Sequence, residues 1–228
     1  LWKKKQNFKG WLWSLFMLSM MVLLLLLQPD LGMTVLFMSI WIIQIFLSGI
    51  PLIIFLLLFC SLPLVLILSY FYFDHVNHRI NMFFDGNSFQ ADQAIKSFQT
   101  GSFFGKGIGE GFYKNYLPDA HTDFIFAVIG EEFGIILCCI IVILYGIFIF
   151  RSLFLAIKGD TLFYVLTVAG LSFLFGMQCI IHISSNLGLI PTKGMTLPFL
   201  SYGGSSMISS SILFGFLLAL TKNKNFYE

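Results

Sequence analysis

The sequence predicts an all-α membrane protein, a polytopic bundle of about six transmembrane helices with one large external loop. Two observations lead to this prediction. The 228 residues are 58% hydrophobic and only 11% charged, whereas a soluble domain is usually about one quarter charged. The charged residues also leave long uncharged gaps, and a helix needs about 20 apolar residues to cross a bilayer. We therefore expect a single integral membrane domain over residues 1–228.

The uncharged gaps define the spans in order. Residues 10–29 form the first gap, and the gap 31–73 is long enough for two spans with a natural break at 48–51. Three more apolar stretches follow a polar region that ends near residue 122. We predict spans near residues 11–28, 31–48, 52–73, 124–150, 161–184 and 201–220.

Basic residues at the span ends predict the orientation, because short cytoplasmic loops carry an excess of Lys and Arg. Threading six spans places eight of these basic residues on one side: Lys3, Lys4, Lys5, Lys9, Arg151, Lys158, Lys222 and Lys224. This side should be the cytoplasm and should hold both termini. The turn at Asp30, the loop 74–122 and the segment around Lys193 then lie outside. The net charge of +2 is too small to indicate a nucleic-acid partner.

The external loop 74–122 is too long for a simple connector, and its recurring Phe and Tyr residues favour an ordered position at the membrane interface. Its glycine-rich stretch "GSFFGKGIGEG", residues 101–111, does not match a phosphate-binding loop, since Lys106 is followed by Gly107. We expect a turn or re-entrant segment there, with Lys106 available to an anionic headgroup.

The stretch "LLLQPDLG", residues 25–32, places an acid between two apolar spans. Pro29 breaks the first helix, and Asp30 is placed to cap the next one. The alternative is that Gln28 and Asp30 line a polar cavity within the bundle.

The stretch "LGLIPTKGMTLPFLSYGGSS", residues 187–206, interrupts an otherwise helical region with prolines and glycines. Lys193 and the N-terminus of the last span, near Ser201, together suit a phosphate or pyrophosphate. The alternative is that Lys193 extends to the membrane interface and the glycines permit close helix packing. The residues themselves favour neither interpretation.

The stretch "PDAHTDFIFAVIGEEFG", residues 118–134, places several acids at the start of a span. Asp123 is positioned as a helix N-cap. Glu131 and Glu132 lie about two turns deeper, roughly 80° and 180° around the helix from Asp123. We expect Glu131 to border the same cavity as Asp123 and Glu132 to meet another helix, and both to be cavity-lining or structural. Candidate partners in the following span are Gln178, His182 and Asn186.

The stretches 25–32, 118–134 and 187–206, in this order along the chain, resemble the SEDS family (shape, elongation, division and sporulation) of bacterial membrane proteins. The stretch "PTKGMTLPFLSYGGSS" is more similar to the FtsW-like cell-division branch. The resemblance covers essentially the whole chain, which is similar to the last six of the family's ten spans. It implies an inverting peptidoglycan glycosyltransferase that polymerises lipid II in the cytoplasmic membrane at the division septum.

The resemblance also implies roles for individual residues. Asp123 matches the family's catalytic aspartate and would act as the general base. His121 and Thr122 would orient it or contact the substrate. The candidates for binding the pyrophosphate are Lys193, Ser201, Tyr202, Gly203, Gly204 and Ser205. No cofactor and no protein-held metal site are expected, and a divalent cation at the pyrophosphate is left open.

The partners implied are lipid II, a class B penicillin-binding transpeptidase and other division proteins. Two other functions compete with the enzyme: a lipid II flippase, and a division scaffold for the transpeptidase. A flippase needs a polar path to the cytoplasmic side. The polar groups of this chain cluster externally, which favours the enzyme.

Overall fold

The computed structural model describes residues 8–28, 30–85 and 88–222, and these residues are helical with connecting turns and without β-strands. Six long helices occupy the predicted ranges: α1 (Phe8–Leu27), α2 (Leu31–Leu47), α3 (Leu52–Tyr72), α6 (Ile125–Ile157), α7 (Leu162–Asn186) and α8 (Gly204–Thr221). Of these, α6, α7 and α8 are long and apolar enough to cross a membrane. The predicted all-α polytopic class is confirmed.

Three helix ends differ from the predicted bounds by three residues or more. α1 begins at Phe8 rather than at 11. α6 continues past residue 150 to Ile157, because an exposed Arg such as Arg151 is a good helix former and does not end a helix. α8 begins at Gly204 rather than at 201, because Ser201 belongs to the preceding turn, where its Oγ accepts a hydrogen bond from Leu197 N.

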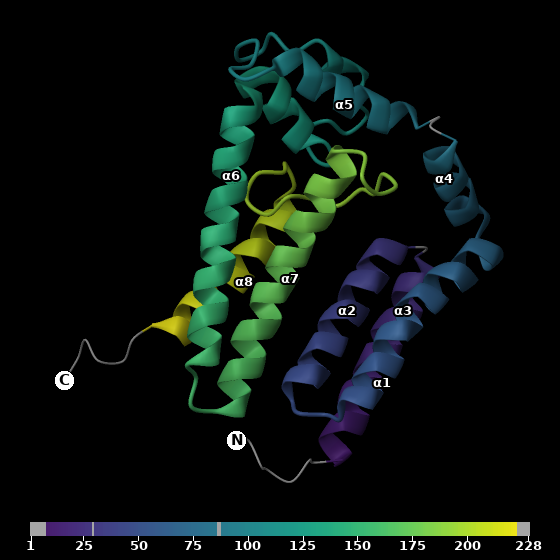
Figure 1. Cartoon of the computed structure of the whole chain (residues 1–228), viewed down its shortest axis with the longest axis vertical. Coiled ribbons are helices and arrows are strands. Elements are labelled where there is room, and N and C mark those ends of the chain that lie inside the picture. Colours follow the sequence, from purple (N-terminus) through teal and green to yellow (C-terminus); the bar gives the residue numbers. More distant parts are fainter. Residues whose placement is uncertain (1–7, 29, 86–87, 223–228) are drawn as a thin grey trace.

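The external loop is ordered and carries helices of its own. α4 (Asp74–Phe84) follows α3, and α5 (Phe89–Gly101) packs against the start of α6, with the short 3₁₀ helix η1 (Tyr113–Tyr116) beside both. A Cβ at Gly101 would lie only 1.9 Å from Gly130 O, so the two backbones touch where a side chain cannot fit. Figure 1 shows this segment covering one end of α6.

The core lies between α6, α7 and α8, where Phe126, Val168, Phe175 and Leu217 are buried together. α2 packs against α7, and α1 and α3 pack against α2. In Figure 1 the external loop and the α7–α8 connection lie toward one end of the bundle, and an ion pair between Asp30 and Lys193 joins the start of α2 to the α7–α8 connection. The α6–α7 turn lies at the opposite end.

α6 is broken near its start. Gly134 has φ 82° and ψ 173°, and a Cβ there would lie 2.3 Å from Phe103 O. The glycine-rich loop fills the break: Ile135 N donates to Ser102 O at 3.0 Å, and Lys106 N donates to Glu131 O at 3.0 Å. The predicted turn at 101–111 is thus hydrogen-bonded to α6 on both sides of the break. Residues 125–133 form a short segment before the break.

Candidate functional site

Asp123 lies at the end of a tight turn just before α6, and it does not cap the helix. Its backbone N–H donates to Asp119 O at 3.0 Å. Phe124 occupies the N-cap position of α6, which has no side-chain cap hydrogen bond. The prediction of a helix-capping role for Asp123 is therefore wrong, because the turn ends one residue later than the sequence indicates.

The backbone around Asp123 is fixed by side chains from two other segments. Asn186, at the end of α7, donates from Nδ2 to Asp123 O at 3.0 Å and accepts from Ala127 N at 3.1 Å. Ser201 Oγ donates to Thr122 O at 2.6 Å, and Tyr202 N donates to His121 O at 2.9 Å. The predicted trio His121, Thr122 and Asp123 is thus held against both α7 and the segment before α8.

The carboxylate of Asp123 is half-buried and lies against Gly194. A Cβ at Gly194 would lie 2.7 Å from Asp123 Oδ2. Burial and the nearby carboxylate of Asp119 raise the pKa of Asp123 above its ordinary value, while a hydrogen bond from Thr122 partly offsets them. Such an acid holds a proton more readily than an exposed aspartate, which is a property of catalytic bases.

Lys193 pairs with an acid from another helix. Its Nζ lies 2.7 Å from Asp30 Oδ1, and both side chains remain partly exposed, at 20% and 31%. Asp30 also accepts from Met33 N at 3.0 Å, so its predicted capping role is confirmed. Burial acts to raise the pKa of Asp30, but the hydrogen bonds from Lys193 and Met33 outweigh it and lower the pKa. Burial and Arg79 lower the pKa of Lys193 despite Asp30.

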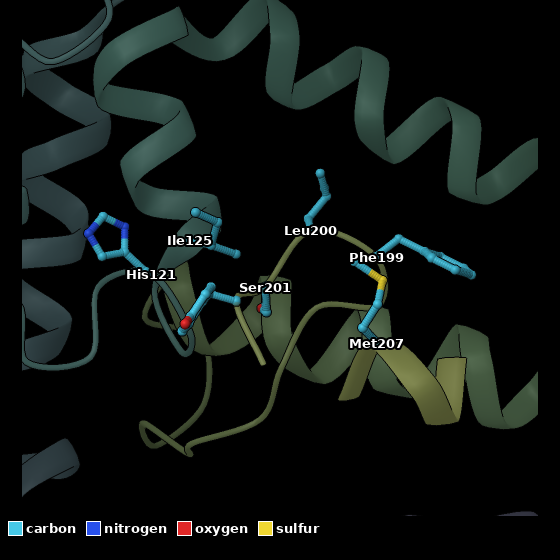
Figure 2. Close-up of a pocket in the computed structure, with 7 residues that line it drawn as sticks. His121, Ile125, Phe199, Leu200, Ser201 and Met207 are labelled. Atoms are coloured by element: carbon cyan, nitrogen blue, oxygen red, sulfur yellow. The ribbon is translucent and has the colours of Figure 1, made fainter. Parts of the chain in front are cut away.

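A pocket of about 430 Å³ lies beside this site, lined by His121, Ile125, Phe199, Leu200, Ser201, Tyr202 and Met207. Figure 2 shows His121 at one end and Phe199 and Met207 at the other. Three of the predicted substrate-binding residues therefore share one pocket. Its other walls are apolar, and Asp123 and Lys193 lie outside the lining.

The remaining predicted residues occupy helix ends. Gly203 is the N-cap of α8, and Gly204 and Ser205 begin it with both residues exposed. The first N–H groups of a helix lack intrahelical partners and attract anions. Gln28 follows α1 and is exposed.

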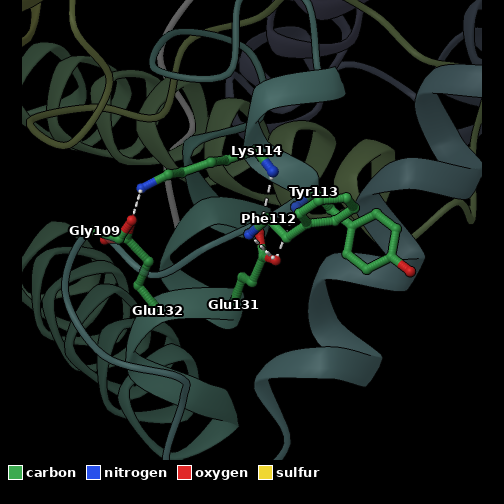
Figure 3. A network of polar contacts seen from close by, with 6 residues as sticks. All are labelled: Gly109, Phe112, Tyr113, Lys114, Glu131 and Glu132. Carbon is green, nitrogen blue, oxygen red and sulfur yellow. Dashed lines mark hydrogen bonds and ion pairs between the residues drawn. The ribbon is translucent and has the colours of Figure 1, made fainter.

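Glu131 and Glu132 bind the external loop rather than another long helix (Figure 3). Glu131 is fully buried and accepts from the backbone N–H of Phe112, Tyr113 and Lys114 at 2.8, 2.9 and 3.1 Å. Glu132 pairs with Lys114 Nζ at 2.5 Å. Glu132 thus meets the short helix η1 of the external loop and not one of the long helices. The expectation that Glu131 borders the cavity of Asp123 is wrong, because helical spacing gives relative faces and not what covers them.

The partners expected for the glutamates bind elsewhere. Gln178 donates to Thr196 O at 3.1 Å, and His182 Nδ1 lies 2.6 Å from Met195 O. These two residues and Asn186 hold the α7–α8 connection and the start of α6. Among the described residues, no three His, Cys, Asp or Glu side chains converge as a metal site.

Comparison with known proteins gives the family and its relatives. The family model for cell cycle proteins of the FtsW/RodA/SpoVE type matches residues 2–226. A probable peptidoglycan glycosyltransferase FtsW of Caulobacter vibrioides is 40% identical over 89% of this chain and 53% of its own length. That of Nitrosomonas europaea is 38% identical over 95% of this chain and 58% of its own length. The chain thus spans little more than half the length of these relatives.

Two solved structures have a similar fold. One is a chain from a peptidoglycan synthase complex that coordinates polymerization and crosslinking, with 28% identity and a TM-score of 0.68 over 91% of this chain and 60% of that one. The other is a mutant of the rod shape determining protein RodA of Thermus thermophilus. It has 25% identity and a TM-score of 0.65 over 99% of this chain and 60% of that one.

Proposed function

This chain belongs to the FtsW/RodA/SpoVE family of cell cycle proteins, and from that premise we propose that it carries the catalytic site of a peptidoglycan glycosyltransferase. The reaction is the polymerisation of lipid II into glycan strands during septal wall synthesis. The relatives in Caulobacter vibrioides and Nitrosomonas europaea are named as probable peptidoglycan glycosyltransferases.

One observation carries the proposal: the fold fixes the backbone around Asp123, and its carboxylate, which accepts a hydrogen bond from Thr122, takes no part in a helix cap or an ion pair among the described residues. Asn186 and Ser201 hold the surrounding backbone. A half-buried acid with a raised pKa, fixed in place by two other segments, is suited to accept a proton.

In the proposed reaction Asp123 takes the proton from the 4-hydroxyl of the acceptor sugar. That oxygen attacks the anomeric carbon of the lipid-linked donor, and the bond to undecaprenyl pyrophosphate breaks. A single displacement inverts the anomeric carbon and requires no covalent enzyme intermediate. The developing negative charge on the leaving group needs cations or amide donors nearby.

The exposed start of α8 supplies amide donors for this charge, at Gly204 and Ser205. Lys193 supplies a cation when an anion competes with Asp30 for it. The apolar walls of the pocket beside His121 suit part of the donor's lipid chain. A divalent cation at the pyrophosphate would take ligands from the substrate. Adding a chelator to the assay tests whether such a cation is needed.

The protein would lie in the bacterial cytoplasmic membrane at the septum, with both termini in the cytoplasm and the site facing outward. There it would work with a class B penicillin-binding transpeptidase and other division proteins.

The test is polymerisation of purified lipid II by the membrane protein together with its transpeptidase partner. We expect Asp123→Asn to lower the rate by about 10²-fold or more, since loss of a general base typically costs 10² to 10⁴. Asp160→Asn, in the exposed α6–α7 turn at the opposite end of the bundle, is the matched control. Parental rates from Asp123→Asn would refute the catalytic assignment. Lost lipid II translocation with normal polymerisation would support the flippase instead.

A further inference from the structure

Residues 192–196, here called the strap, connect the site to α2. At one side of the strap Lys193 forms its ion pair with Asp30 at the start of α2. The aliphatic stem of Lys193 lies across Gly32, where a Cβ would come within 2.3 Å of Lys193 Cε. A larger residue at position 32 would therefore displace the lysine.

Further contacts hold the strap on both sides of Gly194. Met195 is buried with Leu36 and Ile40 of α2, and Met195 O lies 2.6 Å from His182 Nδ1. Lys193 N donates to Ser185 Oγ at 3.2 Å. Gly194 is thus held between two anchored neighbours.

Gly194 is the residue that lies on the carboxylate of Asp123, at a virtual Cβ distance of 2.7 Å. The position of this glycine is consequently fixed by contacts that begin at α2, far from Asp123 in the sequence. Of these contacts, the ion pair alone depends on charge. It lies at a partly exposed edge, where water or an anion can compete for Lys193.

We propose that Asp30 is a positioning residue for the reaction, acting through Lys193 to hold Gly194 against the carboxylate of Asp123. Asp30 pairs with Lys193 of the proposed pyrophosphate site, and its proposed effect on Asp123 passes through Lys193 and Gly194. Asp30 keeps the strap against Asp123. It also holds the ammonium group of Lys193 until an anionic group replaces Asp30 as the partner of Lys193. The inference rests on the proposed function, since it assigns a role in the same reaction.

The Asp30→Asn variant removes the ion pair with Lys193 but can keep the helix cap. Asparagine is an N-cap as good as aspartate, so the hydrogen bond from Met33 N can remain while the charge is lost. We expect kcat for lipid II polymerisation to fall about ten-fold or more, because small displacements of reacting groups are costly. We also expect faster amide hydrogen exchange across residues 192–196.

A double mutant tests whether Asp30 acts through Lys193. Lys193→Met alone should lower kcat at least as much as Asp30→Asn, and adding Asp30→Asn to it should cause no further loss. Gly194→Ala should lower kcat with α2 intact, since the added methyl group displaces the Asp123 carboxylate. Asp160→Asn is again the control that should match the parent.

The outcomes separate this inference from the proposed function. Parental kcat and unchanged strap exchange in Asp30→Asn, with Asp123→Asn inactive, would overturn the positioning role alone. Additive losses in the double mutant would also overturn it. An active Asp123→Asn protein would instead overturn the proposed function, whatever Asp30→Asn does, while the exchange measurement would still report on the strap.

Discussion

α1 and α3 differ from α6 and α7 in what they bury. Within its described side chains α1 buries none, and α3 buries only Ser69. α6 and α7 bury polar groups, among them Glu131, His182 and Asn186. Apolar composition is therefore a poor guide to packing in this chain, because lipid and protein accept the same side chains. Buried polar residues, which need partners, mark where protein packs on protein.

The sharpest test of this difference compares two leucines. Leu217 in α8 is 1% exposed and Leu57 in α3 is 68% exposed. We expect Leu217→Ala to lower the free energy of unfolding by about 2–5 kcal/mol, because it leaves a cavity in the core. Leu57→Ala should change it by less than about 0.5 kcal/mol, since lipid or detergent fills the space. Equilibrium unfolding in mixed micelles measures both, and equal losses would contradict the division.

A second comparison lies within α6 itself. Glu131→Gln should destabilise the protein by about 2 kcal/mol, since three backbone N–H groups lose their charged acceptor. Glu132→Gln should cost about 1 kcal/mol or less, because it removes one ion pair at a partly exposed edge. Limited proteolysis between residues 108 and 116 should report the first change and not the second. The opposite order would show that the buried carboxylate does not anchor the loop.

The smallest expected effect concerns the charge beside the base. A base must be ionised to work, so the raised pKa of Asp123 places the acid limb of the pH–rate profile above that of an ordinary aspartate. Asp119→Asn removes a like charge that disfavours ionisation, and the limb should move to lower pH. Asparagine tolerates the left-handed backbone of position 119, where φ is 54°. A limb that stays or rises would exclude Asp119 as a cause.

The apolar helices could be predicted from the sequence because charges are so costly in lipid that their absence outlines each span. The same reasoning gave the side on which Asp30, the external loop and Lys193 gather. It failed at Asp123, where physical pattern alone indicated a helix cap and only the family resemblance indicated a base.

Other parts of the site depend on contacts between distant segments. In the sequence Asn186 is a single polar residue at a helix end, and no spacing rule predicts its hydrogen bond to Asp123 O. The pairing of Asp30 with Lys193 likewise joins residues from opposite ends of the chain. Gly194 could be identified only once Asp123 Oδ2 was seen beside it. A Gly between Lys and Met in an irregular stretch is a weak indication on its own.

The break at Gly134 has a consequence for how the protein responds to its membrane. Residues 135–157 are about 34 Å long at 1.5 Å per residue, close to the thickness of a bilayer's hydrocarbon core. A span that meets a thicker or thinner bilayer adapts by tilting. At the break the glycine-rich loop bonds both parts of α6, with Ile135 N donating to Ser102 O and Lys106 N donating to Glu131 O. A tilt of residues 135–157 would therefore reach the segment beside Asp123 through this loop, which links the alignment of the site to hydrophobic mismatch through residues 102–106.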